Sequence, residues 1–351
     1  MLALSSQYMN KRISVIISNY NGEKWLQGCL DSLYKQTYKN FEIILVDNDS
    51  EDDSCELVKK NYPEVIVIQN KEDLGFSGGN NVGVKKAKGE YILLLSNDTV
   101  ADKNYLENFV KVFAEIPHLG VAQSKIVLMS NPNKLDSCGA FWTDSTFLYH
   151  YGVGQDQSLQ QYNKAFPIFT VKGASMLIKK DLVDKIGLFD DDFWCYYEET
   201  DFCHRAWLAG YECWYYPKAL VHHAVGGTTT TFFKSDFIQF HSNKNKIMSF
   251  LKNFELINLL YILPVFLSLL VFLSFIWLLQ RKPGYFFSVY KSIFWNITHI
   301  GTTLEKRKKI QALRVRSDRE LSTRIKKNPK LNYYYHLLSG LKDFKEDKIN
   351  Q

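Results

Sequence analysis

The chain has 351 residues, of which 46% are hydrophobic, 15% aromatic and 23% charged, and its formal net charge is +6. This globular composition and length exclude a single ordinary core and predict one large domain with additions, or two domains. The six cysteines form no C-x-x-C pair, which argues against a zinc ribbon or a redox motif. Residues 1–12 lack the features of a secretory signal, so we expect a reduced, cytosolic setting and a structureless N-terminal extension over 1–11.

Residues 12–120 alternate between two hydrophobic patterns. Apolar runs predict strands at 13–18, 41–47, 64–70 and 91–97, and helical spacing predicts helices at 23–36, 52–62, 78–89 and 103–116. Such alternation predicts an α/β fold with a mostly parallel sheet that is covered on both faces. Ligands of these sheets bind beyond the carboxyl ends of the strands, where this sequence places clusters of polar residues.

Residues 121–235 are less regular and rich in aromatic residues. The segment 169–211 predicts a strand, a helix that starts near Asp181 and a second helix from about Glu198, and 211–227 predicts a strand followed by a glycine-ended loop. We expect 12–235 to form one catalytic domain, with 12–120 as its nucleotide-binding half and 121–235 as its acceptor half.

Residues 256–279 carry no charge and contain Pro264, which predicts a kink. At about 1.5 Å per residue a helix of this length covers roughly 36 Å, enough for a hydrocarbon core of about 30 Å. The segment could be a buried core helix, a membrane span or a helix in the membrane interface, and its lack of any polar face favours membrane contact.

A second apolar stretch, 284–300, and a basic stretch, 305–327, follow. A single span would put the basic tail on the other side of the membrane from the catalytic domain, against the positive-inside rule. A kinked re-entrant or in-plane hairpin within 236–304, with the tail 305–351 on anionic lipid, avoids this conflict. Further positive charges in this region are Lys244, Lys246, Lys252, Arg281 and Lys282.

Two carboxylates follow predicted strands. Asp47 in "ILVDNDS" could accept a hydrogen bond from a nucleobase, and Asp98 in "LLLSNDT" could hold a divalent cation that neutralises a leaving diphosphate. Each is equally a good turn residue. The glycines at 75, 78, 79 and 83 do not form G-x-G-x-x-G, which disfavours a dinucleotide oxidoreductase, although a glycine-rich helix entry can approach a phosphate.

The segment "YYEETDFCHR" places Glu198, Glu199 and Asp201 at a predicted helix start. Acidic residues are favoured there in any case, but beside Trp194 they also suit a general-base site under an aromatic sugar platform. Of the adjacent His222 and His223, one could be a metal ligand, and ordinary polar residues are the alternative.

Taken in order, the motifs "SVIISNYNG", "ILVDNDS", "DLGFSGGNN", "LLLSNDT", "KGASMLIKK", "YYEETDFCHRAWLAGY" and "VHHAVGGT" resemble family 2 inverting glycosyltransferases of the GT-A fold. The likeness covers roughly 12–230 and is strongest to a bacterial rhamnosyltransferase-like branch. It implies an α/β nucleotide-sugar-binding fold followed by a helical, membrane-associated region.

The resemblance also implies roles for individual residues. The nucleotide-sugar would be held by Ser18, Tyr20, Asp47, Gly78, Asn81, Asn97 and Asp98. Asp98 matches the last aspartate of the family's D-x-D and Ser96 replaces the first, so His223, with His222 as fallback, becomes the more important partner for Mg²⁺ or Mn²⁺. Glu199 matches the catalytic base, and Trp194, Glu198 and Asp201 would bind or orient the acceptor.

The implied function is metal-dependent, inverting transfer of a sugar, with rhamnose from a thymidine diphosphate donor as first choice, to a lipid-linked or polysaccharide acceptor in cell-surface glycan synthesis. The enzyme would sit at the cytoplasmic face of the membrane through 256–300, and a homo-oligomer is compatible with this reading. The basic tail has no nucleic-acid recognition motif, so no nucleic-acid partner is expected. The rival hypothesis is a catalytically silent, membrane-bound glycan-binding or assembly subunit on the same fold.

Overall fold

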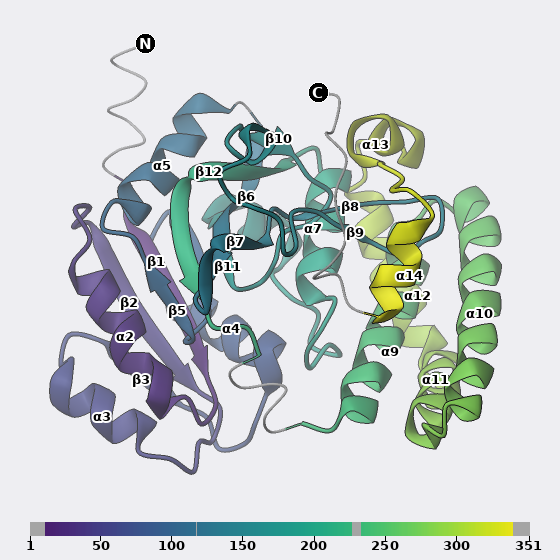
Figure 1. Ribbon diagram of the computed structural model, residues 1–351, viewed down its shortest axis with the longest axis horizontal. Coiled ribbons are helices and arrows are strands. Elements are labelled where there is room, and N and C mark those ends of the chain that lie inside the picture. Colours follow the sequence, from purple (N-terminus) through teal and green to yellow (C-terminus); the bar gives the residue numbers. More distant parts are fainter. Residues whose placement is uncertain (1–10, 117, 227–232, 340–351) are drawn as a thin grey trace.

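The computed structural model of the chain describes residues 11–116, 118–226 and 233–339 (Figure 1). Its strands are β1 (Ile13–Asn19), β2 (Phe41–Asp47), β3 (Ile66–Gln69), β4 (Tyr91–Leu95), β5 (Thr99–Ala101), β6 (Leu119–Leu128), β7 (Asn131–Ser137), β8 (Ala140–Phe141), β9 (Tyr149–His150), β10 (Phe166–Pro167), β11 (Ser175–Lys179) and β12 (Glu212–His223). The helices of the first two-thirds of the chain are α2 (Glu23–Tyr34), α3 (Ser54–Asn61), α4 (Gly75–Lys86), α5 (Tyr105–Glu115), the short 3-10 helix η1 (Gln160–Tyr162), α6 (Lys180–Ile186) and α7 (Glu198–Leu208). Those of the last third are α9 (Ser235–Asn253), α10 (Leu256–Leu279), α11 (Pro283–Thr298), α12 (Ile300–Ala312), α13 (Asp318–Ile325) and α14 (Asn332–Ser339).

The main sheet is mixed. Its central path runs β10-β12-β6-β11-β4-β1-β2-β3, with β5 paired to β12 and β7 to β6. The pairs β1–β2, β1–β4, β2–β3 and β6–β12 are parallel, whereas β11 is antiparallel to both of its neighbours. The predicted fold class is therefore confirmed, and β11 is the strand that reverses direction within the sheet.

Helices cover both faces of the sheet, as the apolar strands predict. One core joins β1, β2 and β4 through Val15, Leu45 and Leu93 to the helices α2, α3 and α5. The other core takes the alternate residues of the same strands, such as Ile16 and Leu94, and joins them to α4, α6 and α7. The strand ends are thus fixed between two layers of helices.

The predicted helix at 78–89 begins earlier than expected. α4 starts at Gly75, so the glycines lie in the first turns of the helix and not in a loop before it. The other helices and strands of 12–120 begin and end within a few residues of the predicted positions. Of the predicted extension 1–11, only Lys11 is among the described residues.

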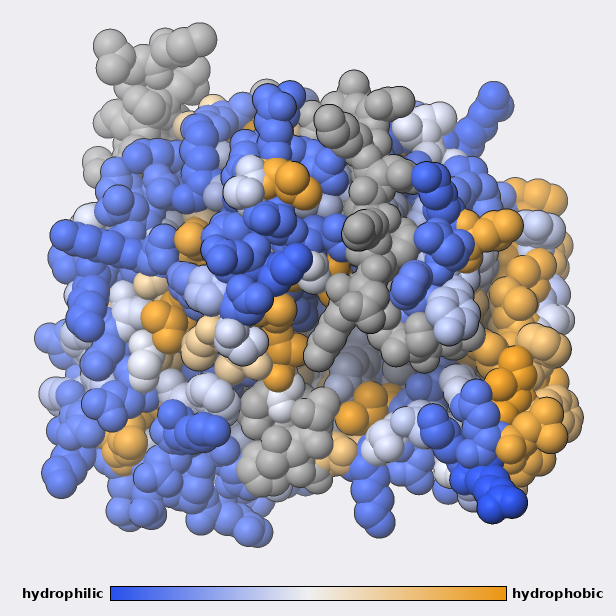
Figure 2. All heavy atoms as spheres, viewed as in Figure 1, coloured by the Kyte–Doolittle hydropathy of each residue, from blue (hydrophilic) through white to orange (hydrophobic). Residues whose placement is uncertain are grey.

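The C-terminal helices pack together on one side of the sheet domain (Figure 1). α10 occupies the predicted segment 256–279 and is the only helix in the described part of the chain that is long and apolar enough to cross a membrane. Of the most apolar 18-residue stretch of α10, only 22% is buried inside the protein. Figure 2 shows the resulting apolar surface at the α10–α11 end of the molecule. Its exposed side chains include Ile257, Leu260, Phe272, Leu279 and Phe294.

The chain returns to the sheet domain after α10. The Glu255 backbone N–H, at the start of α10, donates to Asp318 of α13 at 2.8 Å. The Arg316 guanidinium donates to the carbonyl oxygens of Tyr211 and Gly210 beside β12. The helix α11 packs back on α9, where Ser292 donates to the Phe240 carbonyl at 2.9 Å. α10 and α11 thus form a helical hairpin, and both of its ends are attached to the rest of the protein.

Several cations that were expected on the cytoplasmic side of a membrane, or in the tail on anionic lipid, are buried or paired within the protein. Lys244, Lys246 and Lys252 of α9 are at most 7% exposed. In the basic stretch, Lys306 pairs with Asp190 and Asp192, and Arg314 pairs with Asp318. Lys252, Lys306 and Arg314 each pair with a buried carboxylate, since an unpaired buried charge is costly.

Candidate active site

A chain of side-chain amides links the ends of three parallel strands. Asn97, after β4, donates to Asn19 of β1 at 2.8 Å, and Asn19 donates to Asp47 of β2 at 2.9 Å. Asp47 also accepts from the hydroxyl and the backbone N–H of Ser50. Because Asn19, Asp47 and Asn97 are almost fully buried and bonded, this network fixes the edge of the sheet where the strands end.

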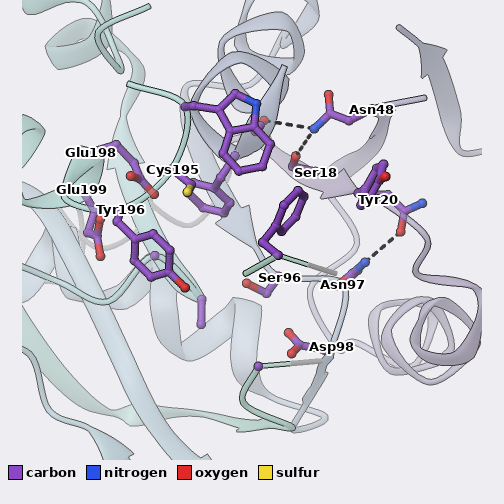
Figure 3. Close-up of a pocket in the computed structure, with 18 of the residues that line it drawn as sticks. Ser18, Tyr20, Asn48, Ser96, Asn97, Asp98, Cys195, Tyr196, Glu198 and Glu199 are labelled. Atoms are coloured by element: carbon purple, nitrogen blue, oxygen red, sulfur yellow. Dashed lines mark hydrogen bonds between the residues drawn. The ribbon is translucent and has the colours of Figure 1, made fainter. Parts of the chain in front are cut away.

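A cavity of about 360 Å³ opens at this edge. Eight of the predicted site residues line it, namely Ser18, Tyr20, Asn97, Asp98, Trp194, Glu198, Glu199 and His223. In Figure 3, Glu198 and Glu199 lie on the side opposite Ser18 and Tyr20, and Asp98 lies below them. The sheet and the start of α7 therefore bring together residues that are up to about 200 positions apart in the sequence.

Aromatic rings form part of the wall near Tyr20. The rings of Trp194 and Phe233 pack edge to face with their centres 4.7 Å apart, and the centre of the Phe233 ring lies 5.9 Å from that of Tyr20. The Trp194 indole N–H donates to the carbonyl oxygen of Asp73, which ties this wall to the entry of α4. Flat, apolar surfaces of this kind suit a nucleobase or a sugar ring.

Asp98 and His223 meet on the floor of the cavity. His223 Nε2 lies 3.3 Å from Asp98 Oδ1, and His223 Nδ1 lies 2.8 Å from Asp136 Oδ2. Asp136 in turn binds the Lys172 ammonium at 2.6 Å. Burial alone would lower the pKa of His223, but the two carboxylates outweigh burial and raise it. Burial would likewise raise the pKa of Asp136, but Lys172 and His223 lower it to about 2.

Strand pairing is the reason for this encounter. β12 runs antiparallel to β5, with His223 opposite Thr99, so the end of β12 lies beside the residue that precedes β5. The Ala224 backbone N–H donates to the Asp98 carbonyl at 3.0 Å and continues this pairing by one more residue. Asp136 lies on β7. β7 pairs with β6, which is the other strand that pairs with the end of β12.

Glu198 and Glu199 begin α7 directly after a strained turn. Tyr196 and Tyr197 have φ values of 65° and 71°, a left-handed conformation that is unfavourable for bulky side chains. The Oε2 atoms of both glutamates are buried and have no hydrogen-bond partner among the residues that the structure describes. Burial raises the pKa of both carboxyl groups, and the charge of Glu199 raises that of Glu198 further. A carboxylate with these properties is suited to accept a proton.

Four predicted site residues do not line the cavity. Asp47 is hydrogen-bonded to Asn19 and Ser50 within the amide network. Gly78 packs on Leu74, where an added Cβ would come within 2.6 Å of the leucine Cβ, and Asn81 bonds to the backbone of Phe189. Asp201 is buried in an ion cluster with Arg205 and Lys252, at 2.9 Å and 3.3 Å. Periodicity within one segment could not distinguish these inward-packed side chains from their cavity-lining neighbours.

The sequence reasoning missed several residues that the structure brings to the site. Asn48 donates to Ser18 Oγ at 3.1 Å and to the Gly75 carbonyl at 3.0 Å (Figure 3). An added Cβ on Gly79 would meet Ser18 Oγ at 2.5 Å, so Gly79, and not Gly78, permits the close approach to β1. Lys172 begins the motif "KGASMLIKK", whose pattern predicts no role for it, and the polar segment around Asp136 contains no recognisable motif.

The site fits a divalent cation only in part. No cluster of three or more His, Cys, Asp or Glu side chains suited to a metal ion occurs within residues 11–116, 118–226 and 233–339. Asp98 and His223 would offer one oxygen and one nitrogen to such an ion. Asp136 orients the imidazole so that Nε2 faces Asp98, as a carboxylate hydrogen-bonded to a metal-bound histidine does. Such a pair suits an ion that takes its remaining ligands from water and diphosphate oxygens.

Comparison with known proteins agrees with this geometry. Residues 14–187 match the family model described as Glycosyl transferase family 2. An uncharacterized glycosyltransferase of Rickettsia prowazekii (strain Madrid E) is 31% identical over 184 residues, which cover 51% of this chain and 54% of that protein. A poly(ribitol-phosphate) beta-glucosyltransferase of Bacillus spizizenii is 33% identical over 189 residues, which cover 44% of this chain and 30% of that protein. The chain thus spans about half the length of the first curated relatives that it matches.

The crystal structure of S. aureus TarS 1-349 has a TM-score of 0.52 to this chain at 16% identity and covers 89% of this chain and 91% of that one. At this identity the likeness concerns the fold, which extends into the C-terminal helices. The family match runs from β1 through α6 and includes the strand ends that build one side of the cavity. We conclude that this chain carries a family 2 glycosyltransferase domain with the GT-A fold.

Proposed function

We propose that the protein transfers a sugar, with inversion, from a nucleotide-diphosphate donor to a hydroxyl group of a lipid-linked or polysaccharide acceptor in cell-surface glycan synthesis. One observation carries this proposal. Glu199 lines the cavity at the strand ends and also lines a second cavity behind it, and one of its carboxylate oxygens has no partner in the described part of the chain. A base on the wall between two cavities can take a proton from an acceptor hydroxyl in the second cavity while that hydroxyl attacks the sugar donor in the first.

The residues divide between donor and acceptor. Ser18, Tyr20, Asn97 and Asp98 hold the nucleotide-sugar in the first cavity. Trp194 and Glu198 line the same cavity and contact the acceptor where its hydroxyl group meets the donor. Asp47 acts through Asn19 and Ser50 as a positioning residue, which revises its assignment as a direct nucleoside ligand. Asp201 likewise holds α7 against α9 and does not contact the acceptor.

Glu199 accepts the proton of the acceptor hydroxyl. The oxygen then bonds to the anomeric carbon while the bond from that carbon to the diphosphate oxygen breaks, and the electron pair leaves with the nucleoside diphosphate. Attack from the side opposite the leaving group inverts the configuration. A divalent cation held by Asp98 and His223 would neutralise charge on the diphosphate.

The relatives support the cell-surface assignment, since the Bacillus spizizenii protein is named for glucosylation of poly(ribitol phosphate). The apolar surface of α10 and α11 supports attachment to the cytoplasmic face of the membrane, with the hairpin lying in the interface. Rhamnose from a thymidine diphosphate donor is the first sugar to test.

Nucleotide-sugar hydrolysis by the purified protein tests the enzyme directly. We expect hydrolysis of at least one member of a panel of dTDP-, UDP- and GDP-sugars in the presence of Mg²⁺ or Mn²⁺. Glu199→Gln should reduce the rate by roughly 10²- to 10⁴-fold, the usual contribution of a general base, and Asp98→Ala should abolish donor binding. Glu56→Gln, on the exposed side of α3, is the matched control. Equal rates in Glu199→Gln and Glu56→Gln would refute the proposal.

A further inference from the structure

The second cavity has a volume of about 480 Å³ and lies between the catalytic domain and the C-terminal helices. It shares Lys172, Tyr196 and Glu199 with the first cavity. One wall is apolar and comes from Phe266, Leu270 and Trp277 of α10. A ligand in this cavity would therefore reach the proposed base at one end and the membrane-type helix at the other.

The opposite wall is polar and comes from one face of α9. Gln239, Ser242, Asn243 and Lys246 recur at helical spacing and all line the cavity. The Asn243 side chain is 5% exposed, and its amide Nδ2 has no hydrogen-bond partner among the described residues. Buried amide donors almost always bind an acceptor, and this one has none among the described residues.

Lys246 is a second donor on this face. Its side chain is 7% exposed, and burial alone shifts its pKa, so no carboxylate of the described residues lies close to its ammonium. The rings of Phe147 and Phe266 surround it at 4.4 Å and 4.3 Å from Nζ. Burial lowers the pKa of Lys246 to about 7, and an anion beside it would restore the charged form.

We infer that the second cavity binds the phosphate-bearing end of an amphiphilic acceptor. The Lys246 ammonium and the Asn243 amide donate to the phosphate oxygens, and the apolar chain of the acceptor follows α10 toward the exposed apolar surface of the α10–α11 hairpin. The sugar next to the phosphate then presents its hydroxyl group to Glu199. This inference rests on the proposed function and assigns the chemical class of its acceptor.

The apolar wall distinguishes this ligand from a free anion. Phe266 and Leu270 are at most 2% exposed and face both the cavity and α9, whereas Leu260, Phe272 and Leu279 of the same helix face outward. One helix therefore carries an apolar lining inside the cavity and an apolar surface outside it. Inorganic phosphate would use Lys246 and Asn243 but would leave this lining unused.

The experiment uses the full chain in detergent and three probes: farnesyl phosphate, farnesol and inorganic phosphate. Binding is followed by calorimetry and by fluorescence, since Trp277 lines the cavity. We expect farnesyl phosphate to bind at least tenfold more tightly than either other probe. Lys246→Met should remove the preference for farnesyl phosphate over farnesol, and Asn243→Leu should reduce it. Lys60→Met, an equal charge change on exposed α3, should preserve it.

Lys246→Met replaces a buried ammonium by an apolar chain of similar length, so its melting temperature should not fall, and a loss of binding then reports on the site. Equal affinity of the wild type for farnesyl phosphate and farnesol would overturn the inference, as would an unchanged preference in Lys246→Met. Inorganic phosphate binding as tightly as farnesyl phosphate would refute the amphiphilic acceptor. Donor hydrolysis is measured separately, so failure of the enzyme proposal is distinguishable from failure of this site.

Discussion

The Asn245 side-chain amide of α9 donates to the Tyr196 carbonyl oxygen at 2.7 Å, and to that of Cys195 at 2.9 Å. These bonds join the C-terminal helices to the strained turn that delivers Glu198 and Glu199. We expect Asn245→Leu to lower the free energy of unfolding by about 2 kcal/mol, at about 1 kcal/mol per hydrogen bond. It should also lower kcat on the order of tenfold to hundredfold, because the base loses its position.

Asn296→Leu is the matched control for this variant. Asn296 is also buried, also has an unpartnered Oδ1 among the described residues and also donates two hydrogen bonds, to Lys244 and Ser292. Urea denaturation should show a similar loss of stability, while kcat stays near that of the wild type. If both variants lose kcat equally, Asn245 acts on stability and not on the turn.

Glu198 and Glu199 should respond differently to pH and to substitution. The pKa of Glu198 is raised in the folded protein by burial and by Glu199. Its favourable contribution is therefore complete below the unfolded pKa of about 4.3 and is lost as pH rises through the folded pKa. We expect Glu198→Gln to be more stable than the wild type at pH 7, with a difference that shrinks toward pH 4 in thermal unfolding scans.

The acid limb of the activity profile should reflect Glu199, whose pKa burial also raises. In the wild type, kcat should fall with decreasing pH at a value above about 4.3, the ordinary pKa of a glutamate. Glu198→Gln should leave this limb in place, because the pKa of Glu198 is raised further than that of Glu199 and Glu198 is still neutral where Glu199 ionises. A limb that moves to lower pH would show instead that Glu198 is charged where Glu199 ionises.

Asp136 should control cation binding without contacting the cation. Asp136→Asn removes the charge that holds His223 Nδ1 at 2.8 Å, and loss of the hydrogen-bond partner of a metal-binding histidine typically costs about 10- to 100-fold in metal affinity. Calorimetric titration with Mn²⁺ in the presence of nucleotide measures this loss directly. Asp144→Asn is the control, since Asp144 is an exposed partner of Lys326 and Asn328. Equal Mn²⁺ affinity in the two variants would show that Asp136 does not orient His223 for the cation.

The apolar surface of α10 should mediate membrane binding. Leu260 and Phe272 are 67% and 63% exposed. Burying one such side chain contributes about 1.5–3 kcal/mol, so replacing either by Glu should weaken binding by roughly tenfold or more. Flotation with vesicles of phosphatidylethanolamine and phosphatidylglycerol measures the effect. Leu159→Glu, at a leucine that is 46% exposed on the catalytic domain, should float as the wild type does. Full flotation of Leu260→Glu would locate the contact elsewhere.

Local pattern was sufficient for the elements of the catalytic domain. Alternating apolar strands and amphipathic helices predicted the α/β class, and the uncharged, mostly apolar run at 256–279 predicted α10 to the residue. The helix start at Glu198 was also predicted correctly. These features depend on neighbours within about ten residues, and their periodicity is written directly in the sequence.

The sequence by itself determined the elements, the family resemblance and the polar residues at the strand ends. Only the tertiary structure decided which of these polar residues face a cavity, because Asp47 and Asp98 follow similar strands and differ in the partners that long-range pairing gives them. The same holds for cations: Lys246 and Lys306 look like surface charges in the sequence, yet one lines a cavity and the other binds Asp190. Burial and pairing between segments set these roles, and neither is a property of one segment.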